Sequence, residues 1–125
     1  MNSIDNLNLH DSTILEICFQ SKNDFNDYIK IIIESNNFIE EFKTKQIELI
    51  IDNCFKVKAN MNMWITGKDT IRSFEIHKNS DWIIEEKEKN KLTPKHIKHA
   101  VLELNTSGSL LNFLITKDIE ISPIF

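Results

Sequence analysis

The stretch FKVKANMNM, residues 55–63, alternates apolar and polar side chains without a break. In extended backbone, this period of two puts all the apolar side chains on one face and the lysines and asparagines on the other. A helix would scatter the same side chains, because successive apolar residues would be rotated by about 200°. The stretch therefore predicts a half-buried β-strand whose inward residues are Phe55, Val57, Ala59, Met61 and Met63.

The same alternation recurs upstream in three segments, TILEICF, YIKIIIE and IELIID. The first two predict a hairpin joined by QSKNDFND, and Asp52-Asn53 suits a tight turn that would pair the third with residues 55–63. A short helix or loop is expected at 37–44, with a strand from residue 46. The residues predicted to point inward are Leu15, Ile17, Phe19, Ile29, Ile31, Ile33, Ile47, Leu49 and Ile51.

Downstream, TIRSFEIH and DWIIEE are weaker strand candidates with mixed alternation. The run EEKEKNKLTP, residues 85–94, has little apolar content and predicts a mobile, solvated loop. HAVLEL, LLNFLIT and DIEIS then predict a three-stranded meander, with Gly108 at a position where φ can be positive.

These patterns together predict a mainly β protein, an antiparallel β-sandwich or open barrel of about seven to nine short strands with at most one short helix. A single sheet would leave one apolar face wet. With 125 residues and 41% hydrophobic residues, the chain is expected to form a single domain over residues 1–125.

Composition narrows the classes of function. The two cysteines, Cys18 and Cys54, lack metal-ligand spacing and favour a reducing cytoplasm without a disulfide. The chain has no apolar run of the length a bilayer span needs, so no membrane association is expected. A net charge of −4 argues against nucleic-acid binding and favours a basic partner.

The histidine, aspartate and serine at positions 10–12 are the first candidates for chemistry. A metal-dependent hydrolase using His10 and Asp11 is one interpretation, although such sites are built on helices and this dipeptide precedes a strand. A catalytic triad is disfavoured, because consecutive side chains on extended backbone point to opposite faces. The preferred interpretation is structural: Asp11 or Ser12 accepts backbone N–H groups at the turn, and His10 packs or donates to a carbonyl.

A second candidate is HIKH, where His96 and His99 could meet on one helical turn with His77 as a third zinc ligand. The spacing is generic, and a solvated segment leading into a strand explains it better. The chain also has no glycine-rich phosphate loop and no nucleophile turn. No catalytic residue, metal site or cofactor is therefore predicted.

Binding anchors are the remaining candidates. Trp64 follows the outward, polar set of its strand, and Trp82 lies at the base of the predicted loop, so both can serve as interface anchors or pack in the core. The predicted partner-binding set joins these tryptophans to the loop carboxylates, and consists of Trp64, Trp82, Glu85, Glu86 and Glu88.

Three stretches carry a family resemblance: LHDSTILEI (9–17), IELIIDNCFKVKANMNMWITGKDTI (47–71) and AVLELNTSGSLLNFLITKDIEI (100–121). Together they resemble a family of small bacterial β-rich proteins that open with a Leu-His-Asp-Ser or Leu-His-Asp-Ala stretch. Related groups look like immunity proteins of polymorphic or contact-dependent toxin systems. The resemblance implies neutralisation of a cognate toxin; it implies no catalytic residue, and its motif, Leu9 to Ser12, can be structural.

The leading hypothesis is a non-enzymatic cytoplasmic binding protein, an immunity protein that occludes a toxin with a basic surface and acts as a monomer or homodimer. Charge complementarity suits this role, since it speeds encounter between partners. Two alternatives stay open. One is the metal-dependent hydrolase built on His10 and Asp11, and the other is a structural homo-oligomer formed through an edge strand.

Overall fold

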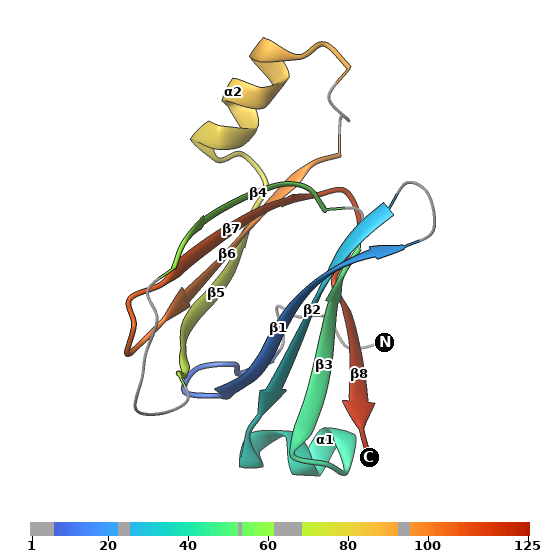
Figure 1. The fold of residues 1–125 in the computed structure, drawn as a ribbon, viewed down its shortest axis with the longest axis vertical. Helices are drawn as coiled ribbons and strands as arrows, with labels where there is room; N and C mark the ends of the chain where they lie inside the picture. Colours follow the sequence, from blue (N-terminus) through green and yellow to red (C-terminus); the bar gives the residue numbers. More distant parts are fainter. Residues whose placement is uncertain (1–6, 23–25, 53, 62–68, 93–95) are drawn as a thin grey trace.

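The computed structural model describes residues 7–22, 26–52, 54–61, 69–92 and 96–125, and it shows a mainly β, sandwich-like fold (Figure 1). Eight antiparallel strands in these residues form two four-stranded sheets. The first sheet has the order β1 (Thr13–Lys22), β2 (Asn26–Glu34), β3 (Gln46–Ile51), β8 (Glu120–Ile124). The second has the order β4 (Cys54–Asn60), β7 (Leu110–Ile115), β6 (Lys98–Leu104), β5 (Ile71–His77).

Alternation correctly predicts the core faces of the central strands. The inward residues of β2 and β3 are buried, and they meet the inward residues of β6 and β7 in one cluster. The connection from β2 to β3 confirms the short helical segment expected at 37–44, as η2 (Asn36–Phe38) and α1 (Ile39–Phe42). Phe38 and Phe42 are buried, with an edge-to-face contact at 6.3 Å between ring centroids that closes one end of the core.

Two predicted pairings are wrong. The predicted pairing of β3 with residues 55–63 fails in the described part of that stretch, because β4 lies in the second sheet and pairs with β7. The closing meander is also interrupted: β6 and β7 form a hairpin, whereas β8 returns to pair with β3. Alternation determines which face of a strand is apolar and carries no information about its neighbour, so these errors have one cause.

Several predicted inward residues lie outside the core, among them Phe19 of β1, which is 56% exposed. A bulge in β1 between Ile14 and Glu16 puts Ile14, not Leu15, against the core. Met61 follows the end of β4 and is 48% exposed. Val57 and Ala59 do share the inner face with the buried Phe113 and Leu111, but both stay exposed because β4 is an edge strand. The Phe55 side chain and Met63 lie outside the described residues.

The sequence prediction misses a second helix, α2 (Asp81–Lys89), which replaces the predicted strand DWIIEE and the first half of the predicted loop. The Ser80 hydroxyl caps it by accepting from the Ile83 N–H at 3.4 Å. Trp82 and Ile83 pack on Ile97 and on Leu114 of β7, forming a second apolar cluster. Figure 1 shows α2 outside the second sheet, on the side away from the first. The expectation of at most one short helix is therefore wrong.

Candidate functional site

The Leu-His-Asp-Ser motif forms a tight turn that joins the two sheets. The Ser12 N–H donates to the Leu9 carbonyl at 3.1 Å, and Asp11 has φ 63°. The turn then pairs with the start of β5, since the Asp11 N–H donates to the Ile71 carbonyl at 2.8 Å and the Ile71 N–H to the Ser12 carbonyl at 2.9 Å. An isolated bridge between Thr13 and Thr70 continues this pairing. We call the backbone pairing of the turn with the start of β5 the seam. The motif thus links β1 to β5 through backbone hydrogen bonds.

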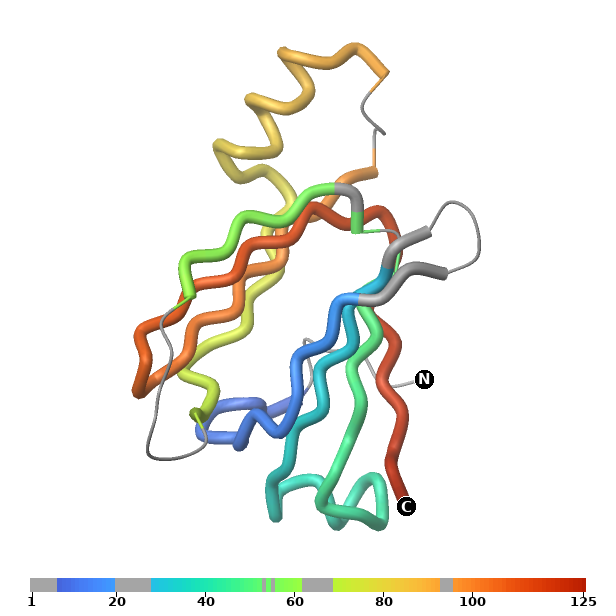
Figure 2. Tube along the Cα trace, in the orientation of Figure 1, coloured from blue at the N-terminus to red at the C-terminus, as the bar shows by residue number. Residues whose placement is uncertain are grey.

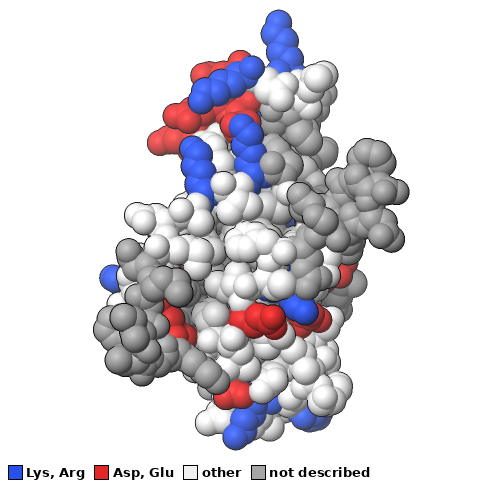
Figure 3. Space-filling model, viewed as in Figure 1, with Lys and Arg blue, Asp and Glu red and all other residues white. Residues whose placement is uncertain are grey.

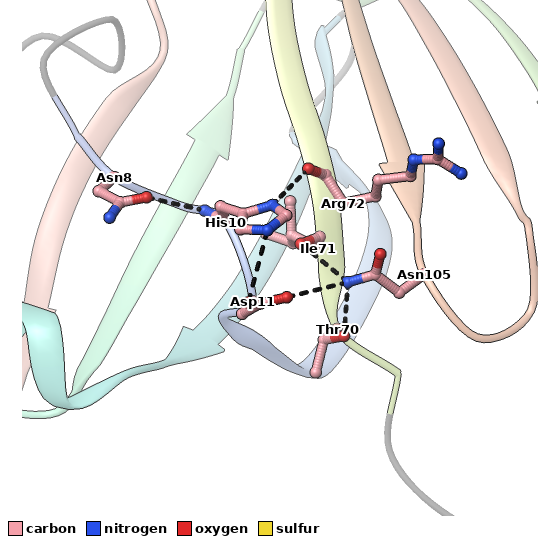
Figure 4. A network of polar contacts seen from close by, with 7 residues as sticks. All are labelled: Asn8, His10, Asp11, Thr70, Ile71, Arg72 and Asn105. Atoms are coloured by element: carbon pink, nitrogen blue, oxygen red, sulfur yellow. Dashed lines mark hydrogen bonds and ion pairs between the residues drawn. The ribbon is translucent and has the colours of Figure 1, made fainter.

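The side chains of the motif support the seam in different ways (Figure 4). His10 Nδ1 donates to the Arg72 carbonyl oxygen at 2.8 Å, as the structural interpretation expects. Asp11 Oδ1 accepts from the Asn105 side-chain amide at 3.3 Å, not from a backbone N–H. Leu9 is buried in the main core, and the buried Ser12 Oγ has no hydrogen-bond partner among the described residues. The expectation that Asp11 or Ser12 accepts backbone N–H groups is therefore wrong.

Asp69, which the sequence interpretation did not single out, anchors the same end of the second sheet. Its carboxylate accepts from the N–H groups of Thr70, Thr106 and Ser107 at 2.8–3.0 Å, and from the Ser107 hydroxyl. Burial of this carboxyl raises its pKa, but these hydrogen bonds together outweigh that effect and hold the pKa of Asp69 below its ordinary value. The acceptor ties the start of β5 to the turn between β6 and β7.

The histidines considered as metal ligands do not come together in one cluster. His10 contacts the start of β5, whereas His77 ends that strand about 16 Å away, at 3.3 Å per residue. His96 and His99 do not share a helical turn, because His99 lies in β6. His77 and His99 are cross-strand neighbours with ring centroids 6.0 Å apart. In the described part of the chain, no three residues of His, Cys, Asp or Glu lie close enough to hold a metal ion.

His99 instead attaches α2 to the second sheet. Its Nε2 donates to Asn112 Oδ1 at 2.8 Å, and its Nδ1 is hydrogen-bonded to the Ser80 hydroxyl, also at 2.8 Å. The Trp82 ring packs edge-on against His99 at 5.1 Å. This residue therefore connects the cap of α2 to β6 and β7.

The predicted partner-binding residues on α2 differ in exposure. Trp82 is 8% exposed, and Glu86 is 5% exposed with Lys56 Nζ bonded to its carboxylate at 2.5 Å. Glu85 and Glu88 are exposed, and Trp64 lies outside the described residues. Figure 3 shows acidic and basic side chains mixed over α2 at the top of the view. The helix therefore presents no surface of one charge.

The outer face of the first sheet is a better candidate, and we call it the acidic face. Because the inward residues of β2 and β3 are buried, the residues between them point outward in rows across the sheet. One row contains Glu16, Ile32, Glu48 and Ser122; the next contains Cys18, Lys30, Ile50 and Glu120; the third contains Thr13, Glu34, Gln46 and Ile124. Four carboxylates and one ammonium thus share this face.

The centre of the acidic face is apolar. Ile32 and Ile50 are half-buried at the middle of the sheet, while Glu16 and Glu120 are exposed on its outer strands. Glu34 accepts from the Gln46 side-chain amide at 3.0 Å, which holds one carboxylate at the margin of the face. An apolar centre with a charged rim is the usual anatomy of a protein interface. Sequence alternation could have marked each residue as outward, but not that they are neighbours.

Comparisons of the chain with family models, curated proteins and solved structures found no match. Among the described residues, no helix has the length and apolarity needed to cross a membrane. The resemblance to toxin-immunity proteins stays a prediction.

Proposed function

We propose that the chain is a non-enzymatic cytoplasmic binding protein, an immunity protein that neutralises a cognate bacterial toxin by direct contact. The observation that supports this proposal most is the acidic face, with its four glutamates around Ile32 and Ile50. A family resemblance carried by the Leu9 to Ser12 motif points to the same class.

The partner proposed for the acidic face has a basic surface. A toxin that cleaves nucleic acid is a suitable case, because its substrate cleft must attract phosphates with lysine and arginine. Glutamates at the rim would speed encounter with such a cleft, and the central isoleucines would lose water on contact. Binding of this kind blocks the toxin without chemistry in the immunity protein.

The test begins with the product of the adjacent upstream gene, expressed in a bacterium with and without this chain. The proposal expects that product to stop growth, this chain to restore it, and the two purified proteins to form a stable complex. A harmless upstream product, or toxicity that this chain does not relieve, would contradict the proposed function.

The role of the acidic face is tested by reversing Glu16, Glu48 and Glu120 to lysine. This variant is expected to associate at least about tenfold more slowly with the toxin at low salt, since rim charges act on the association rate. The matched control reverses Glu41, Glu85 and Glu88, which are exposed elsewhere, and should associate at the rate of the unmodified protein. Loss of binding in the control alone would place the docking surface on the helices.

A further inference from the structure

Among the described residues, β4 is an edge strand of the second sheet. It pairs with β7, and no other strand of the described chain pairs with its second edge (Figure 2). All residues from Lys56 to Met61 are exposed. In an antiparallel pair, every second residue of an edge strand directs its N–H and C=O away from the neighbour. The Lys56 carbonyl accepts from the Cys54 thiol at 3.4 Å. From Val57 to Asn60, the backbone groups that point away from β7 have no strand of the described chain to pair with.

Two of the other edges in the described part of the chain are blocked over part of their length, whereas β1 pairs regularly from Glu16 to Lys22 beyond its bulge and leaves a second open edge there. The start of β5 is covered by the turn at 11–14, through the backbone hydrogen bonds of the seam. β8 contains Pro123, which has no N–H to offer, and β1 has a bulge at Leu15. β4 has its bulge next to Cys54, and the pairing from Lys56 to Asn60 is regular.

The two sides of β4 differ in chemistry. On the outer side, Lys56 is bonded to Glu86 with its side chain still 48% exposed, and the Lys58 ammonium lies 4.6 Å from the centre of the Trp82 ring. On the inner side, Val57 is 40% exposed and Ala59 is also exposed. An added strand would cover these apolar side chains and extend the core surface of the second sheet.

The lysines disfavour two of the registers in which a second copy of the same strand could pair. An antiparallel pair of β4 strands centred on Lys58 would place Lys58 against its own copy, and a pair centred on Val57 would place Lys56 against Lys58. Like charges directly opposite each other destabilise a sheet, whereas opposite charges stabilise it. The same residues that disfavour these registers therefore favour a strand with carboxylates at alternate positions.

We infer that β4 is a strand-addition site for an extended segment of a partner protein, with acidic residues facing Lys56 and Lys58 and small apolar residues facing Val57 and Ala59. This site is separate from the acidic face and has the opposite charge preference. It does not depend on the proposed function, because it rests on the open edge and the two lysines.

The probe is a capped peptide of about nine residues, the length of a strand, that alternates glutamate with valine or alanine. Binding is measured by the anisotropy of a label on the peptide, with the melting temperature as the check on folding. The protein is expected to bind this peptide and not the version in which lysine replaces glutamate. The double variant Lys56→Glu, Lys58→Glu should reverse that preference by about tenfold in each direction.

Two controls separate strand addition from charge attraction. Lys87→Glu with Lys89→Glu makes the same change of charge on the exposed residues of α2, and should keep the original preference. Peptides N-methylated on one or the other alternate set of amides should differ, since only one set can donate to β4. Equal binding of both N-methylated peptides, no binding of the glutamate peptide, or a dimer of the protein held by paired β4 strands would each overturn the inference.

Discussion

The outer faces of the two sheets both contain apolar side chains, but these side chains differ in how deeply they are buried. On the second sheet, Leu114 points outward and is fully buried, because Trp82 and Ile83 of α2 cover it. On the first sheet, Ile32 and Ile50 point outward and are half-buried, with no helix of the described chain over them.

An apolar side chain on the outer face of a sheet is stabilised when another element packs over it. That element can belong to the same chain or to a binding partner. α2 is the internal cover, held by two apolar side chains, the Lys56–Glu86 ion pair and the hydrogen bond between Ser80 and His99. The acidic face has no such cover, which is why its apolar centre supports a binding proposal.

The largest loss of stability is expected on the outer face of the second sheet, where α2 packs on Leu114. Leu114→Ala should lower the free energy of unfolding by about 2–4 kcal/mol, because it leaves a cavity between β7 and α2. The matched variant Ile50→Ala, on the half-buried face, should cost about 1 kcal/mol or less, since less apolar area is lost from contact. Urea unfolding of both variants measures the difference. Equal losses of stability would contradict the claim that only the second sheet has its outer apolar residue covered within the described chain.

The next effect concerns the anchor at the end of the second sheet. Asp69→Asn should cost about 1–3 kcal/mol at neutral pH, because a carboxylate with four donors is replaced by a neutral amide with one acceptor oxygen.

The contribution of the Asp69 carboxylate to stability depends on pH. The pKa of Asp69 in the folded protein lies below its ordinary value of 3.8, so the carboxylate stabilises the fold above that value, and this stability is lost as the pH falls through the folded pKa. The gap in melting temperature between the original protein and Asp69→Asn should therefore narrow as the pH falls below about 3.8. A gap of constant size from pH 6 to pH 2 would show that the charge of Asp69 is not what stabilises the turn.

A smaller effect is expected at the seam between the sheets. Asp11→Ala should cost about 1 kcal/mol, because alanine tolerates the left-handed backbone at φ 63° poorly and loses the contact with Asn105. Asp11→Gly removes the same contact but suits that φ, so it should cost less than the alanine variant. Thermal unfolding ranks the two, and a costlier glycine would mean that the side-chain contact outweighs the backbone conformation.

The smallest effect on stability is expected on the acidic face. Reversal of Glu16, Glu48 and Glu120 to lysine should change the free energy of unfolding by less than about 1 kcal/mol, since two of these side chains are exposed, Glu48 is half-buried, and surface charges contribute little to folding. Chemical unfolding of this variant is also the control for its binding assay. A large loss of stability would show that the face belongs to the fold and would weaken the case for a docking surface.

Local patterns predicted the strands because the side-chain period of a strand requires only its own residues. Ile29, Ile31 and Ile33 of β2 were placed inward on that basis, and so were Ile47, Leu49 and Ile51 of β3. The helix α2 could not be predicted in the same way. Its apolar contacts involve two adjacent residues, Trp82 and Ile83, and those become a helical face only against Ile97 and Leu114.

The two candidate sites also differ in how much of each can be predicted from local sequence. The alternation of lysine with apolar residues on β4 was visible in the chain, since both sides of one strand are local. The acidic face draws its glutamates from positions 16, 34, 48 and 120, which became neighbours when β2 paired with β1 and β3, and β3 with β8. In the regular strands β2 and β3, local alternation is enough to specify which side chains face inward, because that follows from backbone geometry within each strand. In β1 the bulge shifts the inward position from Leu15 to Ile14, which alternation does not reveal. Only the tertiary structure decided which strands are neighbours and which face is covered, because those contacts join residues far apart in the chain.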